Sequence, residues 1–235
     1  LAVLKIDAKD LPSIDIADDA SVDVGDVVLA IGNPVGIGKT VTMGIVSATG
    51  RQLKMSAYED FIQTDAAINA GNSGGALVNA LGELIGINTA IYPRTPTSDG
   101  RGTYTQGAEG IGFAIPVGTA ATGLDQIIKH GRVIRGWIGA DYTDITPANG
   151  ATSRQQGVLV VRVVPESPAA QANLRPGDLL LKLDGSAIVD QIDLRNREAA
   201  TTPGTKVRLE GLRGNQPFAV DVILVQRPAP STTGA

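Results

Sequence analysis

The sequence has 235 residues, of which 43% are hydrophobic and 3% aromatic, enough for one large or two small domains with aliphatic cores. Its net charge of −4 offers no basic surface for nucleic acid, and the absence of cysteine excludes disulfides and thiolate metal sites. No apolar run approaches the roughly 18 residues that span a bilayer. The 29 glycines follow no repeat and are typical of a β-rich fold with many turns.

Apolar runs separated by glycine-rich turns predict strands over the first half of the chain. The run Leu1–Ile6 predicts a buried strand. Six more strands, enough for one closed barrel, are expected at Asp26–Gly32, Val41–Ser47, Phe61–Gln63, Ala76–Val78, Glu83–Ile91 and Ile111–Ile115. The loop Val35–Lys39 is not a phosphate-binding loop, because it lacks the upstream glycine and a strand follows it.

A long loop and a helix follow these strands. Pro93–Glu109 is rich in Gly, Thr and Ser, and a loop of this length is functional or disordered. Helical spacing of apolar residues then predicts a core-packing helix that Gly131 closes. Those residues are Val117, Ala120, Ala121, Leu124, Ile127 and Ile128. The single histidine, His130, is expected at the helix end, where the dipole favours a positive charge.

A second unit is predicted beyond a boundary at Gly131–Gly136. It begins with Trp137-Ile138-Gly139-Ala140. Its expected elements are strands at Gly157–Val164, Leu179–Leu183, Lys206–Leu212 and Phe218–Val225, and helices at Ser167–Asn173 and Gln191–Ala200. Arg227–Ala235 is rich in Pro, Ser, Thr and Gly and is expected to be a disordered tail.

The stretch Gly71-Asn72-Ser73-Gly74-Gly75 is the candidate catalytic motif. Glycines allow a tight bend that presents a serine hydroxyl and points backbone amides at the oxygen that becomes negative during attack. This pattern predicts Ser73 as a nucleophile, with the N–H groups of Gly71 and Ser73 as the oxyanion hole and Asn72 between them. The five residues alone are equally compatible with a glycine-rich hairpin turn that contains an incidental serine.

Four stretches together resemble the HtrA family of trypsin-like serine proteases, and the likeness extends from Leu1 to about Val225. They are Phe61–Asn69, the serine motif, Gly82–Thr89 and Gly110–Pro116. The resemblance implies a mainly β fold: the C-terminal six-stranded barrel of a trypsin-like protease, then an α+β PDZ domain. The expected domains are 1–130, a truncated protease domain whose N-terminal barrel is largely absent, 131–227, the PDZ domain, and 228–235, the tail.

The resemblance also implies roles for residues around the serine. Ile68, Tyr92 and Ile111 would form a shallow apolar pocket for small aliphatic side chains, and strand Gly86–Thr89, with Ile87 and Asn88, would pair with the substrate. A structural role is expected for the Asp65 carboxylate. Arg51, in the expected sensor loop Thr49–Asp60, matches an arginine that switches the site on when the PDZ domain binds a peptide; the alternative is a solvated arginine. No metal or cofactor is expected.

In the PDZ domain, Trp137, Ile138, Gly139 and Ala140 match the loop that binds the carboxylate of a peptide C-terminus. Gly139 favours this role, because close approach of a carboxylate to the amides requires a residue without Cβ. The alternative is an ordinary domain-entry strand with one buried tryptophan. Ala140 is smaller than the apolar residue usual at its position.

The family's catalytic aspartate and histidine precede the position of Leu1, so an N-terminal portion is expected to be missing and the 235-residue chain to be nearly inactive. The resemblance implies a serine endopeptidase of the periplasm that cleaves unfolded or regulatory proteins, forms a homotrimer and is anchored to the membrane in some members. The competing hypotheses are a non-catalytic PDZ scaffold or chaperone for exposed C-termini, and a PDZ-bearing structural domain without a peptide ligand.

Overall fold

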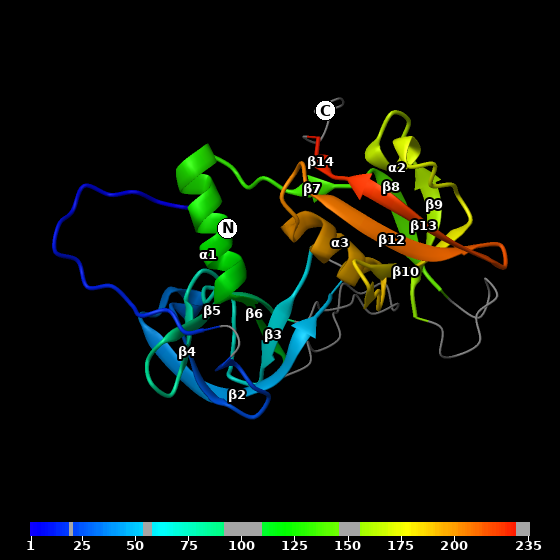
Figure 1. Ribbon diagram of the computed structural model, residues 1–235. Helices are drawn as coiled ribbons and strands as arrows, with labels where there is room; N and C mark the ends of the chain where they lie inside the picture. Colours follow the sequence, from blue (N-terminus) through cyan, green and yellow to red (C-terminus); the bar gives the residue numbers. More distant parts are fainter. Residues whose placement is uncertain (19–20, 54–57, 92–109, 146–155, 229–235) are drawn as a thin grey trace, which may run out of the picture. The chain divides into compact units, whose positions relative to one another are not determined.

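The computed structural model describes residues 1–18, 21–53, 58–91, 110–145 and 156–228. The chain forms two compact units, Leu1–Val133 and the part from Ile134 onward. Each unit has its own sheet and its own core (Figure 1). The expected boundary at Gly131–Gly136 spans the point where the units divide.

The first unit contains a closed barrel whose strands follow the order β1-β2-β3-β6-β5-β4. Every neighbouring pair is antiparallel. The strands are β1 (Val27–Gly32), β2 (Thr40–Arg51), β3 (Phe61–Thr64), β4 (Ala76–Asn79), β5 (Leu84–Ile91) and β6 (Gly112–Pro116), with a short 3-10 turn, η2, at Pro34–Gly36. The six predicted barrel strands are therefore confirmed, although β2 continues through Arg51 where a loop was expected from Thr49.

Alternation of side chains along the strands builds the barrel interior from small aliphatic residues. Val28, Val46, Leu77 and Ala114 are fully buried there, and Ile62 nearly so. Aromatic side chains are few, in keeping with the 3% aromatic content, but Phe113 of β6 is buried and its ring lies 6.1 Å from that of Phe61 in β3.

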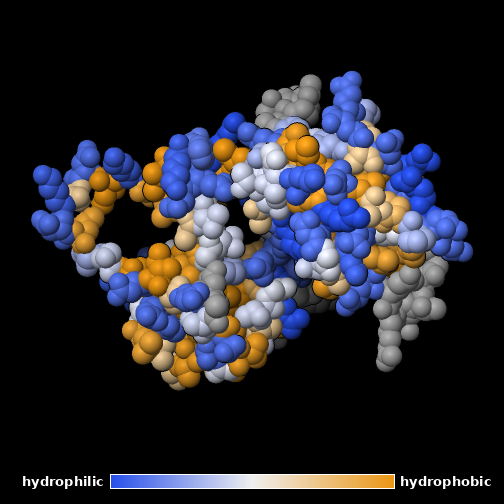
Figure 2. Space-filling view, viewed as in Figure 1, coloured by the Kyte–Doolittle hydropathy of each residue, from blue (hydrophilic) through white to orange (hydrophobic). Residues whose placement is uncertain are grey.

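The predicted strand at Leu1–Ile6 is wrong. These residues form no strand, and Leu4 is 90% exposed. A lone apolar segment gains strand structure only from a partner strand, and no described strand pairs with it. Hydrophobic side chains are exposed along the first 16 residues. Others are exposed on the outer face of β1 and β2, among the orange areas of Figure 2.

Helix α1 (Val117–His130) follows β6 directly and packs against β5 and β6. Gly131 ends it in the left-handed conformation, at φ 71°, and its amide donates to the carbonyl of Ile127 at 2.8 Å. The predicted helix, its glycine stop and the terminal position of His130 are confirmed.

The second unit is built on a sheet in the order β13-β12-β10-β9-β8, with β11 paired to β10 and a separate pair β14-β7. Its strands are β7 (Gly136–Trp137), β8 (Ala140–Asp144), β9 (Val158–Val163), β10 (Asp178–Leu183), β11 (Ser186–Ala187), β12 (Lys206–Arg213), β13 (Gln216–Ile223) and β14 (Val225–Gln226). Helices α2 (Pro168–Gln171) and α3 (Gln191–Ala200) complete it. Strands β7, β11 and β14 were not predicted as separate strands, because two residues are too short for a periodicity signal, and β8 begins at Ala140, which was assigned to the carboxylate loop.

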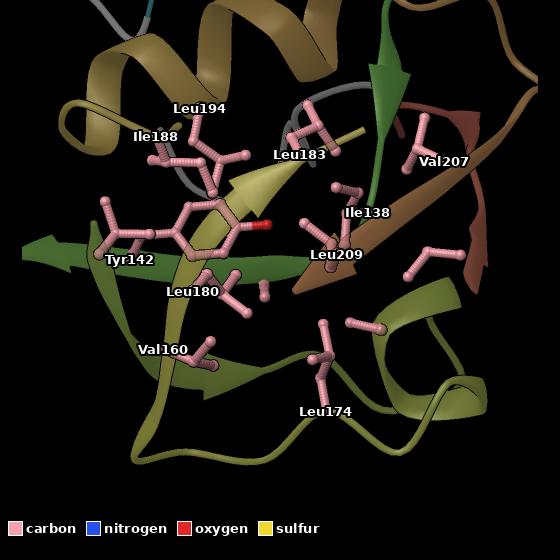
Figure 3. Packing of buried hydrophobic residues seen from close by; sticks show 14 of the residues in the cluster. Ile138, Tyr142, Val160, Leu174, Leu180, Leu183, Ile188, Leu194, Val207 and Leu209 are labelled. Carbon is pink, nitrogen blue, oxygen red and sulfur yellow. The ribbon is translucent and has the colours of Figure 1, made fainter. Parts of the chain in front are cut away.

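The core of this unit lies between the sheet and α3. Ile138, Leu180, Leu194 and Leu209 are fully buried in one cluster, and the ring of Tyr142 lies among them (Figure 3). The cluster joins β8 and α3, so it holds the helix beside the edge of the sheet.

Candidate functional site

The segment Gly71–Gly75, here called the serine loop, is a turn between β3 and β4. Gly71 and Gly74 have φ values of 104° and 86°, which side-chain-bearing residues rarely adopt. The loop presents Ser73 on the surface, since the residue is exposed.

The barrel holds this loop through the chain that leaves β1. The amide of Val35 donates to the Ala70 carbonyl at 2.8 Å, and that of Asn33 donates to the Gly71 carbonyl at 3.3 Å. The approach is so close that a Cβ on Gly71 would overlap the Asn33 carbonyl oxygen. Gly71 is therefore required both for its φ and for the space it leaves.

Asn72 supports the loop and does not offer a donor to a ligand. Its side chain is 2% exposed, its Nδ2 donates to the Ala67 carbonyl at 3.3 Å, and its own amide donates to Asn69 at 3.0 Å. Of the three residues predicted at the oxyanion hole, Asn72 therefore has its backbone donor already in use.

The other two predicted donors, the amides of Gly71 and Ser73, are not in use within the described part of the chain. The amides of Gly71 and Ser73 make no hydrogen bond to any residue that the structure describes. The Ser73 hydroxyl donates to the carbonyl of Thr89 in β5 at 3.0 Å. The loop thus combines an exposed hydroxyl with two amides on either side of Asn72 that are available to a negatively charged oxygen.

No base is placed beside this hydroxyl by the part of the chain described. His130, the only histidine in the sequence, is exposed at the end of α1. Asp65 is used structurally, as expected: its Oδ1 accepts the Ile45 amide at 2.7 Å and joins β2 to the segment after β3. A Cβ on Gly44 would collide with this carboxylate, so the site needs the glycine.

The predicted pocket is only partly visible. Ile68 is buried in the barrel core and lies against the backbone of Gly112, where a Cβ would come within 2.8 Å of the Ile68 Cδ1 atom. Ile111, the neighbour of Gly112, is half-buried. Tyr92 lies outside the described residues, as does the loop Pro93–Glu109.

Ile87 and Asn88 are engaged within the barrel. Ile87 pairs with Ala76 on one side and Ile115 on the other. Asn88 exchanges backbone hydrogen bonds with Gly74 and Gly75. The Asn88 side chain is fully buried and donates to carbonyls of β1 and β4, those of Ile31 and Ala76. The backbone groups of Ile87 and Asn88 are therefore not available for pairing with a substrate strand. Beyond Asn88, the described part of β5 pairs only with β6.

Arg51 is exposed at the end of β2, and its Nε donates to Gln63 Oε1 in β3 at 2.8 Å. This contact joins two neighbouring strands at the point where the chain leaves the barrel. It gives one guanidinium nitrogen a protein partner, while Arg51 itself remains exposed.

In the second unit, the predicted carboxylate loop lies between β7 and β8. Trp137 is half-buried and pairs with Val225, while Ile138 and Gly139 are buried. Gly139 has φ 89°, and a Cβ there would overlap the side chain of Ser167. Ala140 is the first residue of β8 and pairs with Val163. We call the pair Ile138–Gly139 the amide turn.

The amide turn already binds a carboxyl group of the same unit. Glu198 of α3 accepts the Ile138 amide through Oε1 and the Gly139 amide as well. Burial raises the pKa of Glu198 from 4.5 to about 7, against the opposing effects of those amides and of Arg227 and Arg195. Glu198 was not among the predicted site residues; the signal for it in the sequence is an acidic residue in the last turn of a helix, where the dipole disfavours negative charge.

The described residues contain neither a membrane-spanning helix nor a metal-binding cluster. No helix there is long and apolar enough to cross a bilayer. No cluster of three or more His, Cys, Asp or Glu side chains there could hold a metal ion.

Comparison with protein families matches each unit separately. Residues 1–87 match the trypsin-like peptidase domain, and residues 136–224 match the PDZ domain. The second match begins at β7 and ends after β13, so it includes the amide turn and α3.

Known serine endoproteases are similar to almost the whole chain. The serine endoprotease DegS of Escherichia coli K12 is 42% identical over 97% of this chain, and the periplasmic pH-dependent serine endoprotease DegQ of the same organism is 44% identical over 95%. The chain spans 64% of the length of DegS and 48% of DegQ. A solved structure of the HtrA-type protease AlgW with a decapeptide superposes with a TM-score of 0.79 at 46% identity, covering 96% of this chain and 68% of that one.

Proposed function

The chain belongs to the HtrA family of trypsin-like serine proteases, and we propose from this that it is part of a serine endopeptidase with Ser73 as nucleophile. Attack on a peptide carbonyl would place negative charge on the carbonyl oxygen, and the amides of Gly71 and Ser73 would stabilise it. The observation that carries the proposal is the exposed Ser73 hydroxyl beside two amides without a described partner.

The proposal assigns no general base among these 235 residues. The hydroxyl of an unassisted serine is a weak nucleophile at neutral pH. We therefore expect the 235-residue chain alone to cleave an unfolded protein far more slowly than the product of the complete gene. Fluorescence release from a labelled unfolded β-protein, with Ser73→Ala as the reference, tests both statements. If the 235-residue chain cleaved in a Ser73-dependent way and as fast as the complete gene product, the expectation of slow cleavage would be contradicted.

Substrate specificity is proposed for small aliphatic side chains. Ile68 and Ile111 are apolar, and Ile68 lies against the start of β6. The substrate backbone is assigned to β5 beyond Asn88, where the described strand has only one neighbour. Peptide libraries varied at the residue before the cleaved bond would test this: a preference for Lys or Arg over Val and Ala would contradict it.

The second unit is proposed to bind peptide C-termini and thereby regulate cleavage. Among the described strands, β8 pairs only with β9, so its other edge has unpaired backbone groups that an extended peptide could join. The amide turn stands at the start of that edge, where a terminal carboxylate would arrive. Peptides that end in a free acid should bind more tightly than the same peptides ending in an amide.

Arg51 is proposed to transmit peptide binding to the protease site. Its contact with Gln63 places it where β2 and β3 leave the barrel. In the complete gene product, Arg51→Ala should abolish activation by a PDZ-binding peptide and leave basal cleavage unchanged. An unaltered activation curve would leave Arg51 as a surface residue.

The setting proposed for the whole protein follows from its relatives. DegQ and the DegP-like proteins of Brucella are named periplasmic, which supports a periplasmic location. We further propose a homotrimer with a membrane anchor in the complete protein. Fractionation and sedimentation of the complete gene product test these two points.

A second candidate function is a non-catalytic peptide-binding scaffold or chaperone. It is favoured by one observation, that the Ser73 hydroxyl donates to a backbone carbonyl instead of a side-chain base. The two functions differ in the effect of Ser73→Ala on the complete gene product. Unchanged protection of unfolded proteins together with no cleavage by either form would support the scaffold.

A further inference from the structure

Glu198 is a buried acidic residue that has no role in the proposed endopeptidase reaction. It lies in the last turn of α3 and is 4% exposed. Taking an ionisable group out of water is costly unless hydrogen bonds satisfy it, and here the donors are the backbone amides of Ile138 and Gly139. The last turn of a helix offers no compensation, because its dipole opposes a negative charge.

Two carboxylates fix α3 beside the open edge of β8, one at each end. Asp144, at the end of β8, accepts the backbone amide of Gln191 at the start of α3 at 2.7 Å. Glu198, near the end of α3, accepts the amides that precede β8. The helix therefore runs antiparallel to the strand. Ten helical residues cover about 15 Å and five strand residues about 16 Å, so the two elements match in length.

The amide turn has the backbone geometry of an anion site. The positive φ of Gly139 turns its amide toward the same point as the preceding one, which is how successive N–H groups form a concave anion-binding nest. Figure 3 shows Ile138 in the core with the Tyr142 hydroxyl pointing into the same cluster. That hydroxyl has no described hydrogen-bond partner, so the interior around the turn is short of polar partners.

We propose that the Glu198 carboxylate occupies the anion site in which the C-terminal carboxylate of a peptide would bind, so that a peptide binds only when Glu198 gives up the amides of Ile138 and Gly139. This inference rests on the proposed peptide-binding function of the second unit. It assigns Glu198 as the residue that sets how strongly, and at which pH, that unit takes a peptide end.

Protonation is the means by which Glu198 gives up the amides. A neutral carboxyl group accepts hydrogen bonds less strongly than a carboxylate, and a second carboxylate beside an ionised Glu198 would be repelled. The groups that face it are Arg195 on α3, Arg227 after β14, and Tyr142 on β8. Asp141 on β8 is held by Arg162 at 2.7 Å. Since the pKa of Glu198 is about 7, peptide binding takes up a proton at neutral pH and weakens above it.

The test uses the full 235-residue chain and fluorescent decapeptides that differ only in the last residue, Ala, Val, Leu, Phe or Tyr. Each is made as a free acid and as a C-terminal amide. Fluorescence anisotropy gives Kd between pH 5.5 and 8.5. Glu198→Gln imitates the protonated side chain, and Glu198→Val removes the acceptor. Glu210→Gln makes the same change at a half-exposed carboxylate of β12 and serves as the matched control.

If binding needs a protonated group of pKa about 7, the affinity of the original chain for free-acid peptides falls about tenfold from pH 6 to pH 8. Glu210→Gln should behave in the same way. Glu198→Gln and Glu198→Val should bind about tenfold more tightly than the original chain at pH 8, with Kd constant within about twofold over the range. In the absence of peptide, the amide NMR signals of Ile138 and Gly139 should titrate near pH 7 in the original chain and stay constant in both variants.

The outcomes separate the two proposals. Equal Kd values for the original chain and Glu198→Val at pH 8, with free acid still preferred over amide, would overturn the role of Glu198 and leave the peptide-binding function standing. Amide signals that do not titrate would overturn it too. If no variant binds any free acid at any pH, the peptide-binding function fails, and the role of Glu198 with it.

Discussion

The serine loop and the amide turn each contain a glycine with positive φ, yet only the amide turn binds a carboxyl group of the chain. In the serine loop the amides of Gly71 and Ser73 have no described partner. In the amide turn the same kind of donors bind Glu198. The difference teaches that such backbone amides bind a carboxyl group of the protein itself where the fold brings one close. They remain available to a ligand only where the fold brings none.

The largest expected effect is on the open site. Ser73→Ala should lower cleavage of an unfolded protein by the complete gene product roughly 10⁴-fold or more, because the nucleophile is lost while the amides remain. Initial rates of peptide-bond cleavage measure it. Ser186→Ala, at an exposed residue of β11, is the control and should leave the rate unchanged. A residual rate within tenfold of the original would show that another residue is the nucleophile.

The next effect applies to both sites. Gly71→Ala and Gly139→Ala should each lower the free energy of unfolding by roughly 3–5 kcal/mol, because a Cβ would be strained by φ and would also overlap a neighbour. Gly82→Ala and Gly177→Ala, which have similar φ but open space, should cost only about 1 kcal/mol. Urea unfolding monitored separately in each unit distinguishes the two classes, and equal losses in all four variants would remove the argument from close approach.

A smaller effect belongs to the occupied site alone. Because the pKa of Glu198 is about 7 in the fold and near 4.5 when unfolded, the folded state binds more protons between these values, and stability falls as pH rises through this window. The rise in the pKa of Glu198 corresponds to a loss of roughly 3 kcal/mol at most in the free energy of unfolding. Urea unfolding at pH 4.5 and pH 8 should show Glu198→Gln gaining stability relative to the original chain by up to this amount. A constant difference would mean that Glu198 is ionised as easily as in water.

The smallest effect concerns the edge of the barrel that carries the open site. Arg51→Ala should change the free energy of unfolding by no more than about 0.5 kcal/mol, because an exposed hydrogen bond to Gln63 exchanges readily with water. Thermal unfolding measures this. A loss above about 1.5 kcal/mol would make Arg51 a structural residue and would weaken its proposed regulatory role.

The barrel could be predicted strand by strand because its apolar runs are bounded by glycine turns, and the helix before Gly131 because its spacing is strictly periodic. The strand predicted at Leu1–Ile6 is absent for a physical reason. An apolar sequence indicates that a segment can form a strand, but it does not show that a partner strand is present. Ile87 and Asn88 show the same limit, since the family motif that assigns them to the substrate does not reveal that β4, the serine loop and β6 already pair with them.

The local chemistry of this protein was determined by the sequence: a serine set among glycines, a helix closed by Gly131, and a tight turn at Gly139, each of which depends on neighbours within a few residues. Tertiary structure alone decided which of the amides in these two turns remain available. Glu198 reaches Ile138 across 60 positions of the chain. Periodicity and propensity act over one or two turns of backbone, so contacts between such distant residues are set only when the core brings α3 against the sheet.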